Sequence, residues 1–330
     1  MQVSLQIYDP KTRVGMRGML KTKSAGKQIL LVVSITLACF FLLGLLGTVI
    51  LSMVTGMNLS EIGNTDQWNY SDPRTVAMIR GMQAVQFVSL FLVPAWINTY
   101  FLTTDRRTYL GLRVMQPKYL LAGVAVMIIS IPFVNWMGEL NRQIDFPPDM
   151  AAWMKEKEEQ ASLMIRALLS RRSPADLMLN LFFIAVLASV GEELLFRGLL
   201  QRLFIKLFRS PLAGILVSAF LFSAMHMQFY GFFPRFLLGA VLGLIYWYSG
   251  SLWIAIIAHF VYDAALIILA YFYPEMLNDE STVKVTNMAF AGLVSFAITA
   301  ALIFWMKVNS RTKYAEVYAN DAVPVKDHPF

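Results

Sequence analysis

Long hydrophobic stretches alternate with short polar segments along most of the chain. Several of them approach the roughly 20 apolar residues that a helix needs to cross the hydrocarbon core of a bilayer. The pattern predicts an all-α fold, a polytopic membrane helical bundle with about eight transmembrane helices. The expected spans are residues 29–54, 77–102, 119–136, 176–198, 212–229, 233–249, 251–273 and 287–306.

The composition agrees with this pattern. Of the 330 residues, 57% are hydrophobic and only 15% are charged, whereas about a quarter of the residues in soluble domains are charged. The chain is therefore expected to be an integral, multi-pass membrane protein whose surroundings are the lipid bilayer. Its one cysteine, Cys39, lies within the first span, so a single chain can form neither a disulfide nor a thiolate metal cluster.

Lysine and arginine gather in alternate loops. If the N-terminus is cytoplasmic, most of the 28 basic residues fall on the cytoplasmic side, as the positive-inside rule requires. We therefore expect both termini to be cytoplasmic, in a bacterial cytoplasmic membrane. The same bias accounts for the net charge of +7 as a matter of topology, and no nucleic-acid partner is implied.

The spans and loops divide the chain into consecutive segments. We expect a basic cytoplasmic N-terminal segment (1–28), N-terminal transmembrane helices (29–136), an extramembrane amphipathic insertion (137–175), a helical core that carries the candidate chemistry (176–273), a last transmembrane helix (274–313) and a flexible tail (314–330).

Apolar residues within the insertion recur at helical spacing next to the charged run KEKEE, residues 155–159. They are Ala161, Met164, Ile165, Leu168 and Leu169. This spacing predicts an amphipathic helix on the outer face of the membrane. Such a helix is either a solvated connector with one apolar side or a lid over a site.

Ionisable residues within the spans point to chemistry. The stretch ASVGEELLFRG, residues 188–198, holds three of them, and each costs roughly 2.5–3.5 kcal/mol on insertion scales. Glu193 and Arg197 are four residues apart and can pair on a helix. Glu192 then lies on a neighbouring face, and its carboxylate is free for chemistry.

Two later spans carry histidines. His226 lies four residues after Phe222 in FSAMH, and His259 lies four residues before Asp263 in HFVYD. Because the fourth and fifth spans are antiparallel, Glu192 and His226 should lie at nearly the same depth. If the basic stretch 202–209 protrudes into the cytoplasm, the polar groups converge in the cytoplasmic half of the membrane.

Each of these residues alone is as readily explained by packing between helices as by function. Several carboxylates and two imidazoles that converge from three helices are better explained by a buried reaction centre, because each must otherwise be desolvated without a use. A relay of protons or ions in a transporter is an alternative use of the same groups. A catalytically silent scaffold or immunity protein with the same fold is another.

In their order and on these hydrophobic helices, the motifs resemble those of a known family. EELLFR matches EExxxR, FSAMH matches FxxxH and HFVYD matches HxxxN/D. The region 176–273 is similar in this respect to the CPBP intramembrane proteases, the CAAX-processing and bacteriocin-processing enzymes of the Rce1/Abi type. The resemblance implies an endopeptidase that hydrolyses a peptide bond of a membrane-associated protein or peptide.

The resemblance also implies roles. Glu192 and His226 are expected to activate a water molecule, and His259 with Asp263 to stabilise the oxyanion. Glu193, the second acid of the motif, is expected to belong to the catalytic group, where its role, together with Arg197, is support. Phe222 is also expected to be a supporting residue.

One position departs from the amide form of the last motif. An ionised Asp263 can only accept hydrogen bonds, whereas asparagine can donate one to an oxyanion. His226, His259, Glu192 and Asp263 are also suitable ligands for a catalytic zinc ion. The expected cofactor is therefore none or Zn²⁺, and metal-free catalysis by Glu192 is the preferred alternative.

Overall fold

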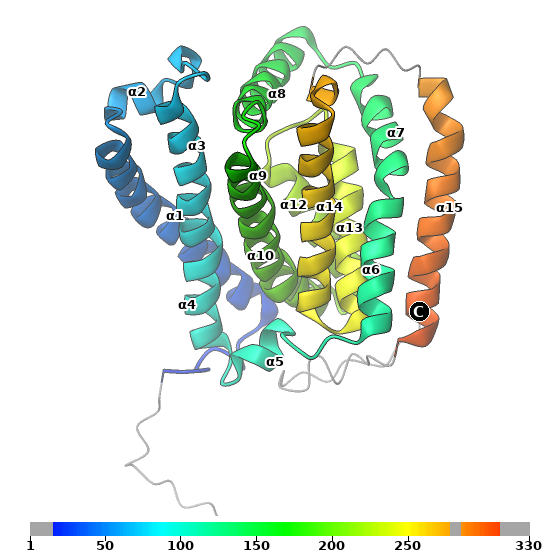
Figure 1. Ribbon diagram of the computed structural model, residues 1–330. Coiled ribbons are helices and arrows are strands. Elements are labelled where there is room, and N and C mark those ends of the chain that lie inside the picture. The colour runs from blue at the N-terminus through cyan, green and yellow to red at the C-terminus, as the bar shows by residue number, and fades with distance from the viewer. Residues whose placement is uncertain (1–15, 278–284, 311–330) are drawn as a thin grey trace, which may run out of the picture.

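The computed structural model describes residues 16–277 and 285–310, and this part of the chain is built from helices (Figure 1). The α-helices are α1 (Ala25–Thr55), α2 (Leu59–Gly63), α3 (Pro73–Gln86), α4 (Val93–Leu102), α5 (Arg106–Leu110), α6 (Pro117–Ile129), α7 (Ile131–Arg142), α8 (Pro148–Leu169), α9 (Pro174–Asn180), α10 (Leu187–Glu193), α11 (Arg202–Phe208), α12 (Pro211–Met225), α13 (Phe232–Ser249), α14 (Leu252–Phe272) and α15 (Val285–Asn309). Segments of π-helix, Phe87–Leu92, Leu181–Val186 and Leu194–Gln201, join neighbouring α-helices. The predicted tail, 314–330, lies outside the described residues.

Proline and short polar residues mark the helix starts. Ser173 precedes Pro174 and accepts a hydrogen bond from the backbone N–H of Asp176. Ser210 likewise precedes Pro211, and its side chain accepts a backbone hydrogen bond at the start of α12. Serine satisfies an N–H group that has no partner within the helix, and proline fixes a helical φ where its missing N–H costs nothing. Such local signals set the helix ends close to those that the hydrophobic pattern predicts.

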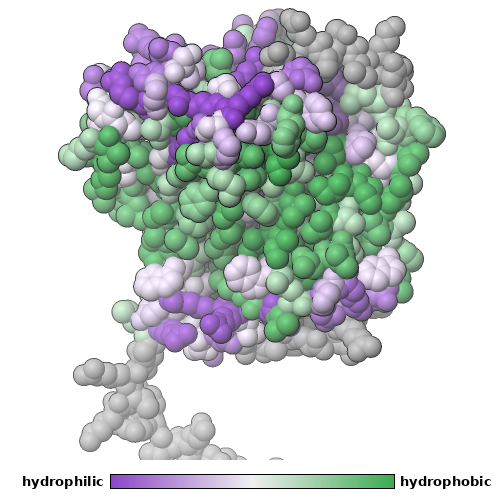
Figure 2. All heavy atoms as spheres, in the orientation of Figure 1, coloured by the Kyte–Doolittle hydropathy of each residue, from purple (hydrophilic) through white to green (hydrophobic). Residues whose placement is uncertain are grey.

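Helices long and apolar enough to cross a membrane confirm an all-α, polytopic bundle. In the described residues they are Ala25–Thr55, Pro73–Leu102, Pro117–Arg142, Pro174–Phe208, Phe232–Ser249, Leu252–Phe272 and Met288–Asn309. The remaining predicted span, 212–229, corresponds to α12, which is apolar but has only 15 residues. Figure 2 shows the resulting hydrophobic band with hydrophilic residues gathered at both ends.

The helices lie side by side in three groups (Figure 1). Helices α1, α3 and α4 form one edge, α6, α7 and α15 form the other, and α10, α12, α13 and α14 lie between them. The start of α1 and the end of α15 are at the same end of the bundle, together with α5, whereas α8 lies at the opposite end. That the first of these ends is cytoplasmic stays a prediction from the loop charges.

Helix α8 is the amphipathic helix predicted in the insertion. It buries Met154, Ala167 and Leu168, while Lys155 and Glu156 on its other side are exposed. Ala167 and Leu168 pack into a cluster with residues of α3. The helix is thereby fixed against the bundle and is more than a solvated connector.

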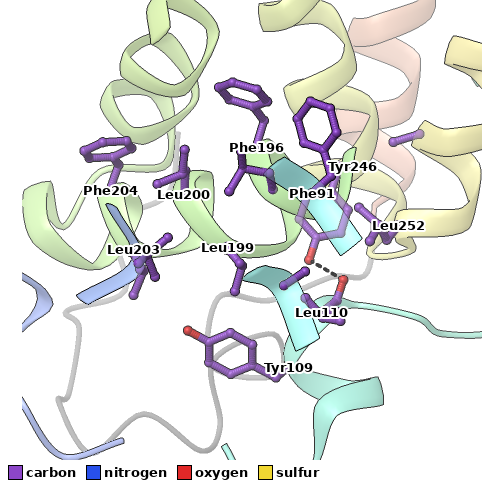
Figure 3. Packing of buried hydrophobic residues seen from close by; sticks show 14 of the residues in the cluster. Phe91, Tyr109, Leu110, Phe196, Leu199, Leu200, Leu203, Phe204, Tyr246 and Leu252 are labelled. Atoms are coloured by element: carbon purple, nitrogen blue, oxygen red, sulfur yellow. Dashed lines mark hydrogen bonds between the residues drawn. The ribbon is translucent and has the colours of Figure 1, made fainter. Parts of the chain in front are cut away.

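The largest hydrophobic core lies around the middle helices and α5 (Figure 3). It includes Phe91, Tyr109, Leu110, Phe196, Leu199, Leu200, Leu203, Phe204, Tyr246 and Leu252. The Tyr246 hydroxyl donates a hydrogen bond to the backbone oxygen of Leu110, at 3.3 Å. This core holds the chain that follows the two glutamates against α5 and α13.

Two polar side chains set the register between that chain and α13. Arg197 Nη2 donates to the Gly239 oxygen and Gln201 Nε2 donates to the Gly243 oxygen, each at 3.1 Å and each across 42 residues of sequence. A Cβ atom at Gly243 would lie 2.7 Å from Gln201 Oε1, so a side chain at this position would displace the Gln201 amide. The two helices therefore run parallel in a fixed register.

Candidate active site

Glu193 and Arg197 form the buried ion pair that their spacing predicts. Arg197 Nη1 lies 2.9 Å from Glu193 Oε1, and the two side chains are 1% and 0% exposed. Arg197 also lies over the ring of Phe222, with its guanidinium carbon 4.7 Å from the ring centroid. Buried charges must be paired and hydrogen-bonded to be tolerated. The pairing is present, but among the described residues Glu193 Oε2 and Arg197 Nη1 are buried atoms without a hydrogen-bond partner.

Glu193 has a second partner that the sequence did not reveal. His259 Nδ1 lies 3.0 Å from the same oxygen, Oε1, that faces Arg197. Because a carboxylate can only accept, Nδ1 of His259 carries the proton. The contact joins α10 to α14 and fixes the orientation of the imidazole, so that its Nε2 atom faces Asp263, 3.4 Å from Oδ2.

His226 immediately follows the last residue of α12. Its Nδ1 atom lies 2.8 Å from the Phe222 backbone oxygen, and since a carbonyl can only accept, Nδ1 carries the proton. In the neutral imidazole Nε2 then presents a lone pair. The Phe222 ring packs edge-on against His226 and His259, with centroids 5.1 and 6.2 Å away, which gives Phe222 the supporting position expected of it.

Glu192 lies between the two imidazoles. Its oxygens are 3.8 Å from His226 Nε2 and 3.9 Å from His259 Nε2. These distances exceed a direct hydrogen bond and leave a gap of the kind that one bridging water can close. Every predicted site residue is thus brought together, with Glu193 and Arg197 behind Glu192 and not in contact with the cavity.

A cavity of about 610 Å³ opens next to this cluster. Its polar lining includes Glu192, His226, His259, Asp263, Tyr262, Gln228 and Arg235, and Ile165 and Leu169 of α8 complete the wall. Because α8 and the turn after α12 form part of the wall, the cavity lies toward the end of the bundle that faces away from the start of α1. Helix α8 thus forms part of the wall of the cavity.

The predicted depth depends on the basic stretch 202–209 protruding, and this condition is met only in part. Arg202 and Lys206 are 2% and 8% exposed, whereas Arg209 is exposed. Arg202 lies over the Tyr109 ring, 4.3 Å from its centroid, and Lys206 Nζ lies 3.3 Å from Gln28 Oε1. Packing against α5 and α1 draws these two side chains into the bundle, and the depth of the site in the membrane stays a prediction.

Arg235, Gln228 and Tyr262 are the polar groups of the cavity that sequence reasoning missed. Arg235 lies within the predicted span 233–249. A charged residue inside a span is costly and usually functional, and this signal was available from the sequence. Gln228 follows the short end of α12, and no motif marks it.

A catalytic zinc ion requires a particular number and arrangement of side-chain ligands. Catalytic zinc binds about three protein ligands at 2.0–2.2 Å and one water. In the part of the chain that the structure describes, no group of three or more His, Cys, Asp or Glu side chains is arranged to hold a metal ion. We therefore derive no step through a metal.

The fold and the site define a polytopic membrane protein with a carboxylate–imidazole centre inside its helical bundle. Residues 174–265 match the family model described as Type II CAAX prenyl endopeptidase Rce1-like. The match covers the helices that carry all three motifs and confirms the resemblance to the CPBP and CAAX proteases. At the family level it supports an intramembrane CAAX-type protease.

Part of the chain is similar to a curated protein whose description gives no function. Over 89 residues the chain is 29% identical to a protein of Bacillus subtilis (strain 168) described as "Uncharacterized protein YpbD". The aligned part is 26% of this chain and 42% of that protein, so the chain spans less than half the length of the relative it matches. No solved structure matches the chain.

Removal of Arg197 should destabilise the protein. In Arg197→Met the carboxylate of Glu193 stays buried with one partner fewer, which costs roughly 3–5 kcal/mol. We expect a clearly lower melting temperature in detergent and partial recovery when Glu193→Gln is added. Arg142→Met is the matched control, because Arg142 pairs at a half-exposed site where such pairs contribute about 0–1 kcal/mol. Wild-type stability of Arg197→Met would contradict the supporting role.

The accessible side of the cavity can be measured by labelling. In a Cys39→Ala background, Gln228→Cys should react with a membrane-impermeant thiol reagent from the side that labels Lys155→Cys on α8. It should not react from the side that labels Arg209→Cys, at the turn between α11 and α12. Reaction of Gln228→Cys from the Arg209 side alone would contradict the position assigned to the cavity.

Proposed function

We propose that the protein is an intramembrane endopeptidase in which Glu192 activates water to hydrolyse a peptide bond of a membrane-associated protein or peptide. The observation that carries this proposal is the place of Glu192 in the cavity wall, 3.8 and 3.9 Å from the Nε2 atoms of His226 and His259. Its neighbour Glu193 is fully buried and already held by Arg197. A water between Glu192 and the imidazoles is placed to lose a proton.

His226 suits the transfer of that proton. Its Nε2 lone pair faces Glu192, while Nδ1 is held by the Phe222 carbonyl. The imidazole can therefore share the proton taken from water and return it to the leaving amine, which must be protonated to depart. His259 suits a positioning role instead, because Glu193 and Asp263 hold its two nitrogens.

We propose further that this chemistry needs no metal. The support is geometric: in the described residues no group of three or more His, Cys, Asp or Glu side chains is arranged to hold a metal ion. A carboxylate near two imidazoles can act on water as a general base without a Lewis acid.

Replacement of Glu192 by glutamine should abolish cleavage. The amide keeps the shape of the side chain but cannot take a proton, and loss of a positioned base costs about 10²–10⁴ in rate. We suggest proteoliposomes mixed with membrane proteins from cells that lack this chain, in water enriched in oxygen-18. Mass spectrometry then counts new carboxyl termini that carry the heavy oxygen.

The control for this experiment is Glu139→Gln, because Glu139 lies in a half-exposed ion pair on α7. It should cleave at the wild-type rate. Wild-type turnover by folded Glu192→Gln would contradict the assigned base. A wild-type protein that cleaves nothing but dissipates a proton gradient across the vesicle would favour the transporter.

Chelation separates the metal-free mechanism from a zinc mechanism. We expect protein treated with a chelator and dialysed to keep its wild-type cleavage rate, and elemental analysis to find much less than one zinc per chain. A stoichiometric zinc ion together with activity that is lost on chelation and restored by zinc would overturn the metal-free proposal. Deprotonated carboxylates and neutral imidazoles are ligands through which proteins bind such an ion.

A further inference from the structure

The register of α13 brings a second arginine, Arg235, to the level of Glu192 and Glu193. The bonds from Arg197 to Gly239 and from Gln201 to Gly243 both span 42 residues. One helical turn back along both parallel helices, the same offset pairs Glu193 with Arg235. Arg235 lies in the cavity wall and attracts Glu158 of α8 as well as Glu192.

The guanidinium of Arg235 is held by the turn that follows His226. Nη1 donates to the Gln228 backbone oxygen at 3.2 Å, and Nη2 donates to Gln228 Oε1. A Cβ atom at Gly231 would lie 2.5 Å from Nη1, so the turn backbone packs directly on the guanidinium. Met227 in this turn has φ 54°, a conformation that non-glycine residues keep only where their surroundings impose it. Arg235 is thus fixed before any substrate binds.

Peptide hydrolysis requires a donor for the oxyanion, and the two imidazoles are poor candidates. The only N–H of neutral His226 is directed to the Phe222 oxygen, and the corresponding N–H of His259 is directed to Glu193. If His259 is protonated, its second N–H faces Asp263. While both rings are neutral, neither has an N–H that is directed into the cavity.

Other cavity groups are no better placed. Asp263 carries a carboxylate where an amide could have donated, and it can only accept while ionised. Tyr262 offers one neutral hydroxyl, and Gln228 offers one neutral amide. A guanidinium carries five N–H donors, of which Gln228 takes two from Arg235, and charge-assisted hydrogen bonds are about twice as strong as neutral ones.

We propose that Arg235 is a catalytic residue that donates hydrogen bonds to the oxyanion of the tetrahedral intermediate. This inference rests on the proposed endopeptidase function. The oxygen of water bonds to the carbonyl carbon while its proton passes to Glu192, and the carbonyl π pair moves onto the oxygen that Arg235 holds. When the C–N bond breaks, that pair reforms the carbonyl, and the amine takes the proton that Glu192 received and that His226 shares.

The test is a kinetic comparison with a fluorogenic peptide whose sequence is taken from a protein cleaved in the oxygen-18 experiment. Loss of one oxyanion donor typically lowers kcat by about 10²–10³. We therefore expect Arg235→Gln to lose this much in kcat with KM within about twofold of wild type. Arg142→Gln, which removes a half-exposed arginine on α7, is the matched control and should keep both constants.

Arg235→Lys protects the test against misfolding of the glutamine variant. It keeps the charge as a single ammonium but loses the planar fork, so we expect a folded protein whose kcat lies between those of wild type and Arg235→Gln. Melting temperatures in detergent identify any variant that is merely unfolded.

The outcomes separate the two proposals. Wild-type kcat in folded Arg235→Gln or Arg235→Lys, with Glu192→Gln inactive, overturns the oxyanion role and leaves the endopeptidase intact. A large rise in KM with unchanged kcat also overturns it, and indicates that Arg235 binds an anionic group of the substrate instead. Absence of cleavage by the wild-type protein overturns both proposals.

Discussion

The buried carboxylate of Glu193 is the interaction on which the rest of the site depends. One of its oxygens meets Arg197 at 2.9 Å and His259 at 3.0 Å, so a single group ties two turns of one helix to α14. An acid removed from water is stable only when its partners are in place. The helices must therefore pack in one register, and that register turns His259 toward Asp263 and leaves Glu192 to face the cavity.

The site consists of a buried supporting layer and a layer exposed to the cavity. Adjacent residues of one helix, Glu193 and Glu192, belong to different layers because they lie on different helical faces. The second layer is completed by elements far away in sequence: the turn after α12 supplies Gln228, α13 supplies Arg235, and α8 supplies Ile165 and Leu169. The side chains that complete the cavity wall thus come from parts of the chain outside the three motifs.

Local periodicity explains why much of this was predictable. Hydrophobic length gave the spans, and the four-residue spacing of Glu193 with Arg197 and of His259 with Asp263 placed each pair on one helical face. The contact between Glu193 and His259 depends on how two helices pack across 66 residues of sequence, which no local pattern encodes. The burial of Arg202 was equally hard to predict, because a residue that normally seeks water packs here against an aromatic ring.

The central claim is that Glu192 holds a water against an imidazole while Glu193 serves the structure. An experimental structure of the wild-type protein in lipid, at a resolution that shows ordered water, tests it most directly. The account predicts one water within about 2.6–3.2 Å of both Glu192 and His226 Nε2, the range in which a base can take a proton. A direct contact between Glu192 and a side-chain cation, with no room for that water, would contradict it.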